Sequence, residues 1–193
     1  MGTFFHSDIT SRKQMVEYLT TRDTSDGYEV LDHSVNGNIL YALFRHPKGY
    51  RFISVFKMSG PSTRERAQGD TAWGYKEICE SMGPSFYDCP ERLLSQSDVD
   101  DTYGWREKCR AARRRKAATK ALSQTVRSGT TLKIFTGWAF DPDSHQQEEV
   151  LEDVVFDRNW SATFFVGHRP GGQQYRYYWR DVRHPELEQA SAA

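Results

Sequence analysis

The first third of the chain alternates apolar and polar residues with the period of two that is typical of β-strands. Three segments show this alternation: 28–35, 39–44 and 50–57. The turns between them are Asn36-Gly37 and His46-Pro47-Lys48-Gly49, and Asn-Gly strongly favours a hairpin because both residues tolerate positive φ. The third segment places phenylalanines on one face and Ile53 and Val55 on the other. We therefore predict an antiparallel meander over residues 28–57.

A helix is predicted just before this meander. Ser11 and Gln14 form a capping box, and Met15 and Leu19 follow with helical spacing. We expect this helix to cover the meander, with Phe4-Phe5 ahead of it as a short strand. Residues 59–70 are rich in Gly, Pro, Ser and charge, which predicts a loop.

The longest helical pattern covers residues 103–126. Its apolar or small positions recur every three to four residues, and after Gly104 no Gly or Pro interrupts it before Gly129. A shorter helix is predicted around Leu93 and Leu94, because Pro90 suits a first helical turn.

After Gly129 the pattern returns to short strands. They are expected at 132–135, 154–156, 160–166 and 174–182, with Pro170-Gly171-Gly172 as a hairpin turn. Strand count alone favours a small barrel or a curled sheet. We predict an α+β protein in three parts: an N-terminal α+β domain over 1–101, a long basic helix over 102–128 and a small C-terminal β module over 129–193.

Composition is consistent with a folded chain in a reducing compartment. The 193 residues include 13% aromatics, which supply buried area despite a mean hydropathy of −0.75. The cysteines, Cys79, Cys89 and Cys109, are odd in number and lack C-x-x-C spacing, which argues against a disulfide framework. No apolar run reaches the length of a membrane span or a signal-peptide core, so we predict a cytoplasmic protein without membrane contact.

The formal net charge of zero conceals two blocks of opposite sign. Residues 106–127 carry nine Lys or Arg and one acid, Glu107, whereas residues 141–157 carry seven Asp or Glu and no Lys or Arg. A local block of one sign says more about partners than the net charge does. We expect the acidic segment to lie partly near the basic helix and to compete with phosphates for its arginines.

The basic helix predicts contact with nucleic acid. Lys and Arg along a helix release counterions from phosphates, and Tyr103 and Trp105 can stack on unpaired bases. The alternative is a solvated face or one that docks on the acidic segment. The predicted contacts are Arg106, Lys108, Arg110, Arg113, Arg114, Arg115, Lys116 and Lys120.

Residues 73–90 combine aromatic, Gly, Pro and charged residues in a way that no amphipathic period explains, and we expect an irregular region with short helices. Two interpretations remain open. Trp73 and Tyr75 cover an open face of the meander, with Gly74 allowing close approach. Alternatively Trp73, Tyr75 and Lys76 form a partner-binding surface, because such side chains join apolar bodies to polar heads.

Catalytic and metal sites are less favoured. Glu77 and Glu80 lie three residues apart, as two carboxylates for hydrolysis would, but no nucleophile, oxyanion hole or Gly-rich loop accompanies them. The three cysteines with His33 or His46 lack the close ligand pairs of zinc sites, which favours buried core cysteines. We predict no catalytic residue, no metal and no cofactor.

Several motifs resemble a family of bacterial proteins carried on plasmids, phages and integrative elements. They are Met1-Gly2, Thr10-Ser11-Arg12, Gly37-Asn38-Ile39-Leu40, Trp73-Gly74-Tyr75-Lys76, Glu80-Ser81-Met82-Gly83-Pro84, Tyr87, Cys89-Pro90 and Trp105-Arg106-Glu107. The resemblance covers roughly the first two-thirds of the chain, with a mild departure at Glu77 and Ile78, where members often carry Asp. The family has no established activity. The resemblance implies a role in DNA maintenance, DNA transfer or resistance to host defence.

We therefore expect a non-enzymatic binding protein of a mobile genetic element that contacts nucleic acid or a nucleoprotein complex. The alternative is a host-defence inhibitor, for example one similar to anti-CRISPR proteins, that acts on a host protein through protein–protein contacts. A hydrolase using Glu77 and Glu80 is less favoured than either.

Overall fold

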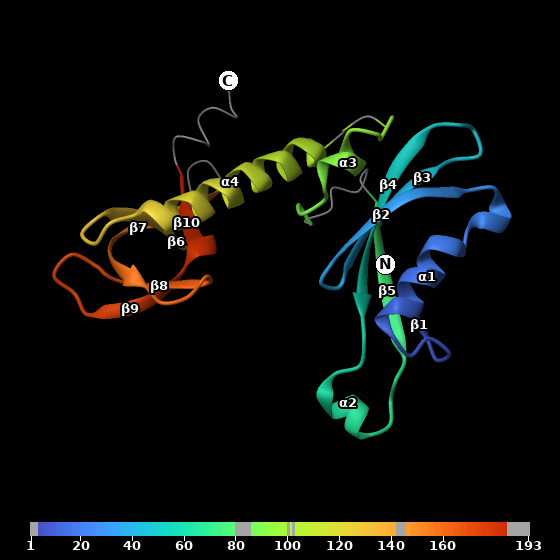
Figure 1. The fold of residues 1–193 in the computed structure, drawn as a ribbon, viewed down its shortest axis with the longest axis horizontal. Helices are drawn as coiled ribbons and strands as arrows, with labels where there is room; N and C mark the ends of the chain where they lie inside the picture. Colours follow the sequence, from blue (N-terminus) through green and yellow to red (C-terminus); the bar gives the residue numbers. More distant parts are fainter. Residues whose placement is uncertain (1–3, 80–85, 100, 102, 142–145, 185–193) are drawn as a thin grey trace. The chain divides into compact units, whose positions relative to one another are not determined.

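The computed structural model describes residues 4–79, 86–99, 101, 103–141 and 146–184. They form two five-stranded antiparallel sheets, sheet A and sheet B, and a long helix α4 (Trp105–Thr125) lies between them in sequence (Figure 1). The predicted α+β class, with its meander, covering helix, long helix and C-terminal β module, is confirmed. The chain divides into two compact units, 1–110 and 111–193, and this boundary falls within α4.

Sheet A has the strand order β1-β5-β4-β3-β2. Its strands are β1 (Phe4–His6), β2 (Glu29–Asn36), β3 (Ile39–Arg45), β4 (Arg51–Ser59) and β5 (Trp73–Cys79). The β2–β3–β4 part is the predicted meander, and Gly37 takes a φ of 58° in its first turn, where a side chain would be strained. The short helices of this unit are α1 (Arg12–Thr21), η1 (Thr24–Asp26), α2 (Thr63–Ala67) and α3 (Glu91–Leu94).

Both faces of sheet A are packed, because its central strands β3 and β4 carry apolar side chains on both faces. On β3, Leu40 and Phe44 face α1, whereas Tyr41 and Leu43 face α3 and the start of α4. The α1 face contains Met15 and Leu19, as the helical spacing predicted. The sheet therefore has two cores: the first core cluster under α1 and the second core cluster around α3 and Trp105.

The segment after residue 72 is a strand, so the predicted irregular structure with short helices is wrong there. β5 pairs with β4 on one side and with β1 on the other. Trp73, Tyr75 and Glu77 share the α1 face of the sheet, because Tyr75 and Glu77 pair with Met58 and Phe56 of that face. The two-residue period is present in the sequence, but Gly74 and the charges interrupt its apolar signal. Residues 80–84, with Glu80 and the Glu80–Pro84 motif, lie outside the described residues.

Sheet B has the order β10-β6-β7-β8-β9 and is an open antiparallel sheet across the described residues. Its strands are β6 (Thr131–Asp141), β7 (Gln146–Asn159), β8 (Phe164–His168), β9 (Gln174–Tyr178) and β10 (Val182–Arg183), with η3 (Trp179–Asp181) before the last. One face carries a third core cluster, which includes Ile134, Phe156, Phe165 and Trp179. The acidic segment 141–157 lies largely in β7.

Among the described residues, no helix combines the length and the apolar character needed to cross a membrane.

Candidate functional site

The first turns of α4 are part of the second core cluster of unit 1. Trp105 is 1% exposed, and its Nε1 donates a hydrogen bond of 3.0 Å to the carbonyl oxygen of Phe86. Cys109, one turn further on, is fully buried in the same cluster. Trp105 therefore cannot stack on a base as predicted, because its indole already packs inside the protein. Tyr103, which precedes the helix, remains 54% exposed.

Two of the predicted contacts to nucleic acid, Arg106 and Arg110, hold unit 1 together. Arg106 donates to the carbonyl oxygens of Ser97, at 3.2 Å, and of Val99. Arg110 donates to both carboxylate oxygens of Glu91, and this hydrogen bonding raises the pKa of Arg110 above its ordinary value. These side chains tie α4 to the segment that contains α3. Lys108 lies between them in sequence and is exposed.

The cations from residue 113 onward belong to unit 2. Arg114, Lys116 and Lys120 are exposed, and Arg113 and Arg115 are half-buried. Arg113, Lys116 and Lys120 are three and four residues apart, so they share one side of the helix. At a rise of about 1.5 Å per residue they extend over roughly 10 Å of it. No acid occurs between residues 111 and 127, so every formally charged residue of this segment is Lys or Arg.

Within unit 2 the last turns of α4 are held by sheet B. Leu122 and Val126 pack against the third core cluster. Asn159 Nδ2 donates to the carbonyl oxygen of Ser123 at 2.9 Å, and Thr119 Oγ1 lies 3.0 Å from a ring nitrogen of His184. These contacts determine which side of α4 packs on sheet B. They therefore also determine which of its Lys and Arg side chains face away from sheet B.

The acidic residues of β7 have partners in sheet B itself. Lys133 contacts Asp153 at 2.8 Å, Arg183 contacts Glu149 at 2.7 Å, and Arg169 contacts Glu152 at 2.7 Å. Asp157 lies 3.1 Å from His168 Nδ1. These four carboxylates pair within sheet B. Glu149 and Asp153 occupy the face of the sheet opposite to the one that packs on α4. The segment still lies partly beside the helix, because Val154 and Phe156 belong to the core cluster against which Leu122 and Val126 pack.

The aromatic rings proposed for partner binding contribute to the first core cluster. Trp73 is 9% and Tyr75 7% exposed, and both pack with residues of α1 and β4. A Cβ on Gly74 would lie 2.6 Å from the carbonyl oxygen of Phe4, so glycine is what lets β1 pair this closely. Lys76 is half-buried on the opposite face of β5. This burial leaves little of either ring for a partner and favours the interpretation of Trp73 and Tyr75 as cover for the meander.

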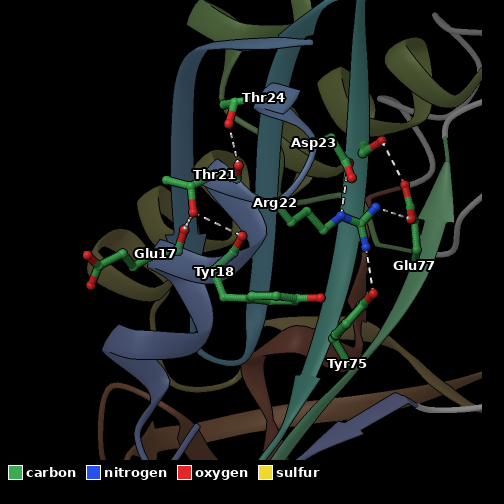
Figure 2. A network of polar contacts seen from close by, with 9 residues as sticks. Glu17, Tyr18, Thr21, Arg22, Asp23, Thr24, Tyr75 and Glu77 are labelled. Atoms are coloured by element: carbon green, nitrogen blue, oxygen red, sulfur yellow. Dashed lines mark hydrogen bonds and ion pairs between the residues drawn. The ribbon is translucent and has the colours of Figure 1, made fainter. Parts of the chain in front are cut away.

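A network around Arg22 joins the end of α1 to β5, and Figure 2 shows its guanidinium directed at three partners. It donates to Tyr75 Oη at 2.6 Å, to Glu77 Oε2 at 2.7 Å and to Asp23 Oδ2 at 2.9 Å. The same guanidinium lies 5.2 Å from the ring centroids of Tyr75 and Phe56. Burial by itself lowers the pKa of Arg22, but the bond to Glu77 and its charge outweigh this effect, so the net direction is upward.

Glu77 is therefore committed to a structural role among the described residues. Arg22 donates to its Oε2 and Ser54 Oγ donates to its Oε1 at 3.2 Å, so both carboxylate oxygens already accept a hydrogen bond. Its predicted hydrolytic partner Glu80 lies outside the described residues. Cys89 is fully buried, as the core interpretation of the cysteines requires. No set of three His, Cys, Asp or Glu side chains in the described part of the chain is arranged to hold a metal ion.

Sequence reasoning missed two groups of residues. Arg22 lies 53 residues from Tyr75 and 55 from Glu77, and no local pattern indicates that they meet. The aromatic and arginine residues on the outer face of sheet B were also missed. Their signal was the alternation of Arg176 and Tyr178 on β9, which we interpreted only as a strand.

Comparisons with protein-family models, with curated proteins and with solved structures find no match to this chain.

Proposed function

We propose that this chain is a non-enzymatic nucleic-acid-binding protein that contacts phosphates through the unit 2 part of α4. The observation that supports the proposal is the run of six Lys or Arg between residues 113 and 127 without an acid, in which Arg114, Lys116, Lys120 and Arg127 are exposed. Three carboxylates of β7, those of Glu149, Glu152 and Asp153, pair with cations of sheet B.

Phosphate contact has a physical signature that distinguishes it from other binding. Each phosphate neutralised by a cation releases condensed counterions, so log K falls with log salt with a slope of about −0.9 per contact on duplex DNA. Arg113, Lys116 and Lys120 share one side of α4, and contact by all three predicts a slope of about −3. The binding is expected to be independent of sequence, because phosphate contacts carry no base information.

A salt titration tests the proposal. The affinity of a labelled 20-base-pair duplex is measured by fluorescence anisotropy in wild type and in Lys116→Glu with Lys120→Glu. The matched control is Lys48→Glu with Lys57→Glu, which makes the same charge change at exposed lysines of unit 1. We expect the helix variant to lose about tenfold or more in affinity and about two units of salt slope. The proposal is wrong if wild type does not bind at low salt, or if both double variants weaken binding equally.

A protein partner is the second candidate, and the β6–β7 hairpin favours it. Trp138 is 58% and Phe140 62% exposed on β6, and Leu151 is 37% exposed on the same face of β7. An exposed apolar group of this kind is typical of a protein-binding surface. The Trp138→Ser and Phe140→Ser double variant is expected to abolish complex formation with a host protein while nucleic-acid affinity is unchanged. Retained complex formation would refute this candidate.

A further inference from the structure

Sheet B presents an aromatic and basic surface on its outer face, opposite the third core cluster. The β8–β9 pairing places Phe164 opposite Tyr178 and Val166 opposite Arg176. Their neighbours Phe165 and Tyr177 belong to the core side. Because strand residues alternate between faces, Phe164, Arg176 and Tyr178 point away from the core. We define the β8–β9 patch as Arg158, Trp160, Phe164, Arg176, Tyr178 and Arg180.

The rings and guanidiniums of this patch are in mutual contact. Arg176 lies 5.2 Å and Arg158 6.0 Å from the ring centroid of Trp160. Arg180 lies 4.3 Å from the centroid of Tyr178, which is itself 4.3 Å from that of Phe164. The patch therefore contains two groups in which a guanidinium lies near an aromatic ring, one around Trp160 and one around Tyr178.

These aromatic rings remain in solvent although unit 2 has an aromatic core of its own. Trp160 is 56% and Tyr178 37% exposed, whereas Trp179, next to Tyr178 in sequence, is 4% exposed. Trp179 packs on Phe156 and Phe165 at centroid distances of 5.8 and 4.7 Å. The core is thus filled without Trp160. Keeping an indole in water forgoes the stabilisation that its burial would give, and clustered exposed rings indicate a binding surface.

The charge of the patch is only partly compensated, because Arg180 Nε lies 3.8 Å from Asp181 Oδ1 and the other two arginines have no such pair within the described part of the chain. Across the described residues, no carboxylate lies within 4.0 Å of the guanidinium of Arg158 or Arg176. At the other end of the same face Arg183 pairs with Glu149 and Lys133 with Asp153. The aromatic rings therefore coincide with the positive part of the face, and an anionic aromatic ligand fits it.

We infer that the β8–β9 patch binds single-stranded nucleic acid. Unpaired bases stack on exposed aromatic rings, and neighbouring arginines contact the phosphates, in a mode that tolerates any sequence. A duplex offers its phosphates but keeps its bases stacked inside, so it cannot use the rings. The inference rests on the proposed function in one respect, since the ligand is again nucleic acid. The β8–β9 patch lies on the face of sheet B opposite to α4, and it adds a preference for single strands to the proposed function.

The test compares a labelled 15-mer of oligothymidylate with a duplex of the same length by fluorescence anisotropy. Trp160→Ala is expected to weaken oligothymidylate binding by about 5- to 100-fold, the range that alanine substitution of a stacking ring produces. Duplex binding is expected to change by less than about twofold, because the duplex does not use the ring. Trp138→Ala is the matched control, since Trp138 is similarly exposed at 58% on the same sheet.

Two further variants separate stacking from charge and from misfolding. Trp160→Phe keeps a ring and is expected to retain oligothymidylate affinity within about threefold. Arg158→Ala with Arg176→Ala is expected to weaken the affinity and to reduce its salt slope by about 1.4, from the single-strand value of about 0.7 per contact. Unchanged oligothymidylate affinity in Trp160→Ala, or equal losses in Trp160→Ala and Trp138→Ala, would overturn the inference.

The two proposals fail separately in this design. Suppose that Lys116→Glu with Lys120→Glu leaves the duplex affinity unchanged while Trp160→Ala weakens oligothymidylate binding. The β8–β9 patch is then supported and the helix contact is refuted. If the helix variant loses duplex affinity and Trp160→Ala changes nothing, the helix contact is supported and the patch is refuted.

Discussion

Replacing Arg22 by Met tests whether its network stabilises unit 1. The Arg22 side chain is 16% exposed, whereas the carboxylates of Asp23 and Glu77 are about one-third exposed, at 34% and 33%. Fully exposed ion pairs contribute about 0–1 kcal/mol, and hydrogen bonds to charged groups about 1.5–3 kcal/mol. The partly buried Glu77 pair therefore contributes about 1 kcal/mol, between these limits.

The aromatic contacts of Arg22 add a second term. The bond to Tyr75 Oη and the position of the guanidinium over the Tyr75 and Phe56 rings contribute about 1 kcal/mol together. Asp23 adds little, because it is adjacent in sequence and reaches Arg22 in the unfolded chain as well. Since Met preserves the apolar stem, Arg22→Met is expected to lower the free energy of unfolding by about 2 kcal/mol.

Urea unfolding, monitored by tryptophan fluorescence, measures this loss. At an m-value of about 2 kcal/mol/M the midpoint falls by about 1 M. Arg45→Met is the matched control, because Arg45 pairs with Glu29 on the same sheet but both side chains are at least half exposed, at 51% and 59%. It is expected to change stability by less than about 0.5 kcal/mol. Equal effects of the two substitutions, or no effect of Arg22→Met, would refute the reasoning.

Two further predictions concern close packing and pH. A Cβ on Gly167 would lie 2.6 Å from a carbonyl oxygen of β7, so Gly167→Ala is expected to destabilise sheet B by about 2 kcal/mol, as measured by thermal unfolding. Gly137→Ala is the control and is expected to leave the stability unchanged, because a Cβ there has no atom within 4 Å. Hydrogen bonds from Arg51 lower the pKa of Asp98 from 3.8 to about 2. The stability contributed by this lowered pKa is present above pH 3.8 and is lost as the pH falls toward 2. Asp98→Asn is therefore expected to make stability less dependent on pH in this range of the acid unfolding curve. An unchanged curve would contradict this prediction.

Elements whose signal is local can be predicted from the amino-acid sequence alone. The β2–β3 hairpin follows from Asn36-Gly37, and the start of α1 follows from Ser11, whose side chain accepts the Gln14 amide as the capping pattern predicted. The long helix follows from an uninterrupted run of helix-compatible residues before Gly129. In each case the information lies within a few residues of the element that it specifies.

The tertiary structure alone decided which side chains meet and which remain in solvent. β5 is a strand because β4 and β1 pair with it on either side. Tyr75 is a core residue because Arg22 and α1 cover it. Trp105 and Trp160 look alike in sequence, each a tryptophan within two residues of an arginine, yet the first is buried and the second exposed. Burial depends on contacts between residues far apart along the chain, so no short pattern separates a core ring from a binding ring.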